Sequence, residues 1–109
     1  MDRKTQAMLF VLDVLNSNSS MSEKELFEKI KEKQEKEGVA FFEFEDGHAG
    51  VGINLDEIIQ LLLLFDLIYC RHVLDKTRFI NLYEISRKGI DFLKRKSDII
   101  STLEGNLES

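Results

Sequence analysis

Two β-rich runs in the second half of the chain limit what this sequence can fold into. Residues 69–74 (YCRHVL) and 78–85 (RFINLYEI) stand on either side of the short segment Asp75-Lys76-Thr77. Two such runs separated by a short polar segment predict a β-hairpin. Because the remaining segments have mainly helical patterns, the sequence predicts an α+β fold.

Two helices are predicted in the first 38 residues. Residues 4–16 (KTQAMLFVLDVLN) carry apolar side chains at helical spacing and on more than one side, so this helix is expected to be buried on several faces. Ser22 is a good N-cap with Glu25 three residues further on, and Gly38 is a natural residue to end the helix that they begin. The second half of that helix has no apolar face and is predicted to project into solvent.

One more helix is predicted on each side of the hairpin. Asn54 is an N-cap followed by two acidic residues, and the helix that it begins runs to about Phe65. Leu55, Ile58, Ile59 and Leu62 form its predicted inward face. Ser86 caps the last helix, and the chain is expected to fray after it.

The connection between the second and third helices has a different pattern. Phe42 and Phe44 alternate with glutamates, Asp46-Gly47 is a turn signal, and two more glycines follow within residues 39–53. We predict a short strand, a turn and a return segment here.

Length and composition place the chain among single-domain globular proteins. The 109 residues are 43% apolar and 32% charged, with a single cysteine. We expect one domain over residues 1–109, with its core in 4–96 and a frayed tail over 104–109. The longest apolar run, Ala7 to Leu12, is far too short to cross a membrane, and so is the run from Leu61 to Phe65. The expectation is therefore a cytoplasmic protein with no membrane partner.

The order of these elements resembles the winged helix-turn-helix superfamily over about residues 4–96. The likeness is carried by the segments MSEKELFEKI, LLLLFDLIYC and YEISRKGIDFL. The last segment is similar to the Tyr-x-Leu-Thr-x-x-Gly pattern of many bacterial regulators, with Ser86 in the Thr position and Gly89 as the Gly. The resemblance implies a three-helix core, a hairpin wing and a C-terminal helix, here with an elaborated connection between helices two and three.

Most stand-alone winged helices bind DNA, so the resemblance also implies which side chains would face bases. These positions of helix three are Asp56, Glu57, Gln60, Leu61 and Leu64. Base edges and phosphates require polar or cationic partners, and no Lys or Arg occurs between Gly38 and Cys70. The long connection is also unlike a DNA-reading helix-turn-helix, and is more similar to the small winged-helix partner subunits of SMC-type and other ABC-ATPase assemblies.

The first functional hypothesis is therefore a non-catalytic interaction or dimerisation module with a protein partner or a second copy of itself. Its predicted surface is apolar with an acidic rim, and consists of Leu61, Leu63, Leu64, Phe41, Phe42 and Phe44. The alternative for these side chains is that residues 39–53 cover helix three. Helix one and the last helix are a second candidate dimer surface.

The second functional hypothesis is a DNA-binding transcriptional regulator. Between Arg71 and Lys96 the chain carries eight basic and only three acidic residues. The candidate phosphate contacts on the wing and the last helix are Arg71, Lys76, Arg78, Arg87 and Lys88.

Catalysis and cofactor binding are not expected. The glycine-rich segment 47–52 lacks the Lys-Ser/Thr of a P-loop, and its neighbours are acidic. Cys70, His72 and His48 are the only thiol and imidazoles, and their spacing does not suggest a metal site. We expect no enzyme activity, no cofactor, no metal and no small-molecule ligand.

Overall fold

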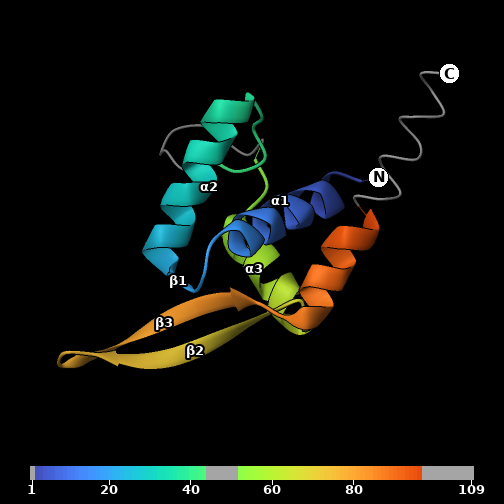
Figure 1. The fold of residues 1–109 in the computed structure, drawn as a ribbon. Helices are drawn as coiled ribbons and strands as arrows, with labels where there is room; N and C mark the ends of the chain where they lie inside the picture. Colours follow the sequence, from blue (N-terminus) through green and yellow to red (C-terminus); the bar gives the residue numbers. More distant parts are fainter. Residues whose placement is uncertain (1, 44–51, 97–109) are drawn as a thin grey trace, which may run out of the picture.

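The computed structural model describes residues 2–43 and 52–96, and places the helices around one end of an antiparallel sheet (Figure 1). A last helix, over residues 87–96, follows the sheet. The other elements, in chain order, are α1 (Arg3–Ser17), β1 (Met21–Ser22), α2 (Glu23–Glu37), α3 (Leu55–Leu64), β2 (Ile68–Asp75) and β3 (Arg78–Ile85).

The capping signals in the sequence predicted the helix starts correctly. The Ser22 hydroxyl accepts a hydrogen bond from the Glu25 N–H at 3.2 Å, and the Ser86 hydroxyl accepts one from the Gly89 N–H at 3.0 Å. Gly38 ends α2 in the left-handed region at φ 68°. A side chain oxygen satisfies an otherwise unpaired N–H at each start, which is why these local patterns are reliable.

The core lies between α1 and its neighbours. In Figure 1, α1 crosses the middle of the molecule, with α2 on one side and the last helix on the other. Eight residues of α1 are buried, as its all-round apolar pattern predicted. The largest fully buried side chains come from all three labelled helices: Leu12, Leu15, Val11, Leu26, Ile30, Ile58 and Leu62.

The hairpin predicted from the β-rich runs is present, and it is part of a three-stranded sheet in the order β1-β3-β2. β2 and β3 pair over their full lengths, from Ile68 with Ile85 to Asp75 with Arg78. β1 was not predicted. It has two residues, too few to show an alternating pattern, and its partners Leu82 and Tyr83 are distant in sequence.

The strand predicted within residues 39–53 needs correction. In the part of this segment that the structure describes, Phe42 and Ile53 form an isolated parallel bridge and no strand. The Phe41 carbonyl accepts a hydrogen bond from the Ile53 N–H at 2.8 Å. Phe44 and the predicted turn at 46–47 lie outside the described residues.

The end of α2 also differs from its prediction. Gln34 is only 7% exposed, although its half of the helix was expected to project into solvent. Its side-chain amide hydrogen-bonds the backbone of Phe42. A polar side chain is buried here because the backbone of the connection satisfies it.

No helix within residues 2–43 and 52–96 combines the length and the apolar character that crossing a bilayer requires.

Candidate nucleic-acid interface

The helix that a winged helix would place in the major groove, α3, has an acidic outer face. Leu55, Ile58, Ile59 and Leu62 are buried, which confirms the predicted inward face. Asp56, Glu57 and Gln60 are exposed on the remaining surface. Carboxylates repel the phosphates of a duplex, so this face is a poor reader of DNA.

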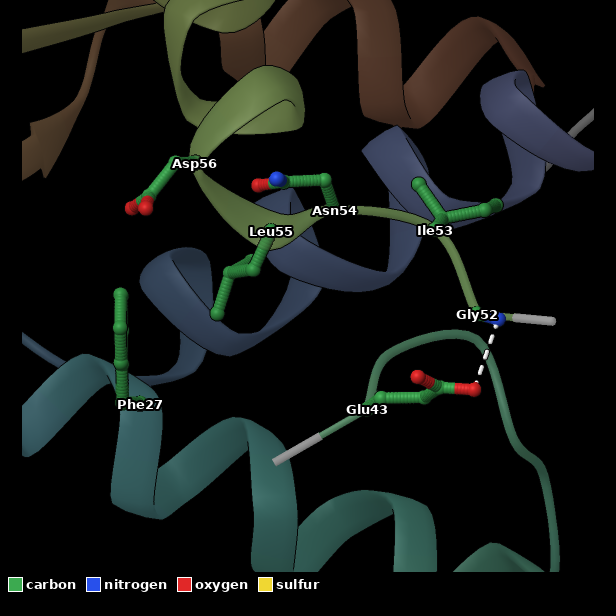
Figure 2. Close-up of a pocket in the computed structure, with 7 residues that line it drawn as sticks. All are labelled: Phe27, Glu43, Gly52, Ile53, Asn54, Leu55 and Asp56. Atoms are coloured by element: carbon green, nitrogen blue, oxygen red, sulfur yellow. Dashed lines mark hydrogen bonds between the residues drawn. The ribbon is translucent and has the colours of Figure 1, made fainter. Parts of the chain in front are cut away.

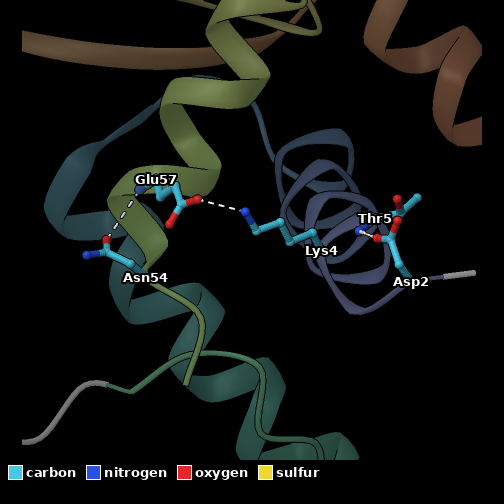
Figure 3. A network of polar contacts seen from close by, with 5 residues as sticks. All are labelled: Asp2, Lys4, Thr5, Asn54 and Glu57. Carbon is cyan, nitrogen blue, oxygen red and sulfur yellow. Dashed lines mark hydrogen bonds and ion pairs between the residues drawn. The ribbon is translucent and has the colours of Figure 1, made fainter. Parts of the chain in front are cut away.

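The first turn of α3 is tied to the start of α1 (Figure 3). Lys4 Nζ lies 2.9 Å from Glu57 Oε1, and the Glu57 N–H donates to the capping oxygen of Asn54. The hydrogen bond to Glu57, with its charge, raises the pKa of Lys4. The Asp2 carboxylate caps α1 by accepting from the Thr5 N–H at 2.7 Å. Lys4, the cation next to the first turn of α3, is therefore already paired with a carboxylate of the protein itself.

A cavity of about 300 Å³ lies at the start of α3 (Figure 2). Glu43 and Asp56 bring two carboxylates to it, and Gly52 donates its N–H to Glu43 Oε1 at 3.0 Å. Its residues, all within the described part of the chain, include no Lys or Arg: Phe27, Glu43, Gly52, Ile53, Asn54, Leu55 and Asp56. Because its charged groups are carboxylates, this cavity does not suit a phosphate. Residues 47–51 of the glycine-rich segment lie outside the described residues.

The predicted apolar interface is only partly on the surface. Leu64 is 73% exposed, whereas Leu61 and Leu63 are half-buried against the core. Phe41 is half-buried and its ring packs against that of Phe10, with 5.3 Å between centroids.

Phe42 requires a correction, because it is 4% exposed and belongs to the core. The alternation of Phe42 with glutamates indicated two faces but not which face is buried. Phe44 lies outside the described residues.

An apolar side chain that the sequence reasoning did not select follows α3. Phe65 is 49% exposed and borders a groove of about 410 Å³ between α1 and the last helix. Met8, Leu67 and Phe92 supply its apolar lining, and two lysines border it as well. The all-round apolar pattern at the end of helix three was the available signal for Phe65. This groove coincides with the second candidate dimer surface.

The five predicted phosphate contacts are all exposed and lie along the wing and just beyond it. Lys76 is in the turn at the tip and Arg78 begins β3. Arg87 and Lys88 are in the first turn of the last helix, at the other end of β3. Since β3 has eight residues, the two pairs are separated by roughly 25 Å of strand. The structure thus spreads these cations along a ribbon instead of gathering them into one pocket.

Arg71 differs from the other four because it is paired within the protein. Its guanidinium lies 2.8 Å from the Glu84 carboxylate on the adjacent strand. Hydrogen bonds from Tyr69 and Ser20, together with the charge and hydrogen bond of Arg71, lower the pKa of Glu84. Arg71 is partly neutralised by this contact, so it is the weakest of the predicted phosphate contacts.

The turn at the wing tip has an unusual backbone. Lys76 adopts φ 60°, the left-handed region in which a residue other than glycine is uncommon. Positive φ at the first of two turn residues is typical of a type II′ hairpin turn, where glycine is preferred. A lysine therefore stands at a position that would accept glycine with less strain.

Cys70 and His72 are two residues apart in β2 and therefore share one face of the strand. Burial raises the pKa of the Cys70 thiol, and the charge of Glu23 adds to the effect. Within residues 2–43 and 52–96, no three His, Cys, Asp or Glu side chains come together in a way that could hold a metal ion.

The helices, the β1-β3-β2 sheet and the projecting hairpin define a winged-helix protein of the α+β class, as the sequence resemblance implied. The structure is similar to the X-ray structure of a PadR-like transcription factor from Bacteroides fragilis, with a TM-score of 0.69 and 16% sequence identity. The match covers 97% of this chain and 90% of the other. No protein-family model matches the sequence, and the comparison with curated proteins found no match.

Proposed function

We propose that this protein is a non-catalytic, DNA-binding transcriptional regulator that contacts duplex phosphates through its wing and the start of its last helix. The observation that carries this proposal is Lys76, a cation kept at the exposed tip of the wing in a backbone conformation that disfavours it. Strained residues are often found at functional positions. The likeness of the fold to a PadR-like transcription factor supports the same function.

The acidic outer face of α3 determines what kind of DNA binding this would be. Asp56 and Glu57 would meet phosphates in the major groove, so base reading by α3 is disfavoured. The wing cations contact the backbone, and backbone contacts carry little sequence information. We therefore expect binding that depends strongly on salt and weakly on sequence.

A second candidate function is supported by the apolar side chains at the end of α3. Leu64 is 73% exposed and Phe65 is 49% exposed, and the acidic residues of α3 lie beside them. An apolar centre with a polar rim is typical of protein interfaces. In this case the protein would be an interaction module that docks a protein partner or a second copy.

Fluorescence anisotropy with a labelled duplex of random sequence, titrated at several salt concentrations, tests the first candidate. We expect dissociation constants of roughly 10⁻⁴–10⁻⁶ M at physiological salt and a steep salt dependence. The double variant Lys76→Asn/Arg78→Ser should bind more weakly and with a shallower salt slope. Lys31→Asn on the exposed face of α2 is the matched control and should bind like the natural chain.

DNA binding and self-association, measured for the natural chain and for Leu64→Ser, distinguish the two candidate functions. Leu64→Ser should leave DNA binding unchanged if the wing is the working surface. If the natural chain does not bind DNA even at low salt, the regulator proposal is wrong. A loss of self-association in Leu64→Ser, measured by sedimentation, would then favour the interaction module.

A further inference from the structure

The wing tip carries two large apolar side chains that the rest of the fold does not cover. Leu74 and Phe79 are directly opposite each other in the β2–β3 register, next to the terminal pair Asp75 and Arg78. Leu74 is 59% exposed and Phe79 is 73% exposed. Opposite residues in an antiparallel pair point to the same face, so the two side chains form one apolar patch.

This patch is not an extension of the core. On the same face of the hairpin, the pair nearer to the helices is Cys70 with Tyr83, and the Tyr83 side chain packs against the core. The polar pair His72 and Asn81 stands between that pair and the tip. In Figure 1 the tip of the hairpin extends beyond the helices. The start of α2 borders a groove with Asp75, Arg78, Ile80 and Asn81, but neither Leu74 nor Phe79 lines it. Because they bury little apolar surface, Leu74 and Phe79 contribute little to the free energy of folding.

The charges around the patch indicate which partner it fits. Lys76 lies in the turn just beyond the patch, and Arg78 precedes Phe79 in β3. Arg78 and its register partner Asp75, the one carboxylate in residues 72–81, point to the opposite face of the hairpin, where they border a groove with Glu23, Glu25 and Glu28 of α2. Cations beside an exposed aromatic ring suit a polyanion that has an apolar interior within reach. A DNA duplex meets both conditions, since phosphates line the minor groove and stacked bases form its floor.

We propose that Phe79, supported by Leu74, enters the minor groove and wedges between base pairs while Lys76 and Arg78 hold the flanking phosphates. The inference rests on the proposed DNA-binding function and adds a mode of binding to it. Apolar wedges of this kind unstack a base step and bend the duplex. Pyrimidine–purine steps such as TA are the easiest to unstack, so the expected substrate is A·T-rich duplex with TA steps.

The test uses the full chain and a duplex with a central TA step in which 2-aminopurine replaces one adenine, with a fluorescent donor and acceptor at its ends. Binding of the natural chain should raise the 2-aminopurine fluorescence and increase end-to-end energy transfer. Phe79→Thr and Leu74→Thr keep a high strand propensity at exposed positions, so both should fold. Phe79→Thr should lose both signals and bind at least about fivefold more weakly, with an unchanged salt slope.

Two controls separate this inference from the proposed function. Lys76→Asn should lower the salt slope by about 0.9 and keep the fluorescence signals at saturation. Ile90→Ala removes an exposed apolar side chain of the last helix and should change neither readout.

Three other outcomes would contradict the wedge, and one of them would also contradict the regulator proposal. If the natural chain binds DNA but Phe79→Thr keeps both fluorescence signals, the wedge is wrong and the regulator proposal stands. If the natural chain does not bind DNA, both are wrong. If Phe79→Thr leaves DNA binding intact but makes an oligomer dissociate in sedimentation, the patch is a protein interface and the wedge is again wrong.

Discussion

The side-chain amide of Gln34 pairs with both backbone polar groups of Phe42. Its Nε2 donates to the Phe42 carbonyl at 3.1 Å, and its Oε1 accepts from the Phe42 N–H at 2.7 Å. A single side chain thus replaces the neighbouring strand that would otherwise satisfy this stretch of backbone. The contact fixes the connection to α2 at Phe42, the residue that also forms the bridge to Ile53.

Replacing Gln34 by Ala should destabilise the protein. The substitution leaves the N–H and carbonyl of buried Phe42 without their partner, and we expect a loss of about 2 kcal/mol in the free energy of unfolding. Urea denaturation followed by circular dichroism measures this loss. Glu35→Ala at the next, exposed position is the control, and equal losses in both variants would contradict the role of Gln34.

Replacing Lys76 by Gly or Asn should stabilise the protein. Both residues tolerate φ 60° better than lysine does, and the expected gain is about 0.5–1 kcal/mol. Thermal unfolding would show it as a higher midpoint. Thr77→Gly is the matched change at the turn position without positive φ and should lower the midpoint instead. A fall in both variants at position 76 would rule out strain at the turn.

Replacing Gly89 by Ala should push the start of the last helix away from Leu67, in the segment between α3 and β2. A Cβ at this position would overlap the Leu67 carbonyl, which accepts a hydrogen bond from the Ser86 N–H at 3.0 Å. Because that neighbour is backbone, relief requires the helix to shift, and we expect a cost of about 2 kcal/mol. Lys88→Ala, one residue earlier and exposed, should change the unfolding midpoint little.

Glu84 should make stability depend on pH in the acid range. Its pKa is lowered in the folded protein by hydrogen bonds from Tyr69 and Ser20 and by Arg71, so the ionised form favours folding. This contribution is present above pH 4.5, the ordinary value for a glutamate, and is lost as the pH falls through the lowered pKa. Urea midpoints at neutral pH and well below pH 4.5 should differ less in Glu84→Gln than in the natural chain. An equal difference would show that other carboxylates dominate.

The local features of the fold were predictable and the non-local ones were not. Ser22, Asn54 and Ser86 were identified because a cap depends on residues three positions away. β1 was missed because its pairing with β3 joins segments about 60 residues apart, and two residues carry no periodic signal. The burial of Gln34 was not predicted either. It depends on hydrogen bonds to the backbone of Phe42, and the spacing of apolar residues along a helix does not indicate such contacts.

The candidate site shows the same limit. The cations of the wing were predicted correctly as exposed, because charged side chains are rarely buried. Leu61 and Leu63 were predicted on the surface, but both are half-buried. Phe79 was assigned to a strand, but its exposure depends on how far the hairpin reaches beyond the helices. The strain at Lys76 arises from the turn type, which the hairpin register determines.

The bridge between Phe42 and Ile53 closes the connection at its base, directly before the Asn54 cap of α3. The direction in which α3 begins is therefore set by this closure and by Gln34, whatever number of residues lies between the two bridged positions. Doubling the length of a closed segment costs only about 0.6 kcal/mol in chain entropy. Related chains can thus lengthen or shorten this segment during evolution without moving α3, and a reporter peptide inserted there should leave the winged-helix scaffold intact.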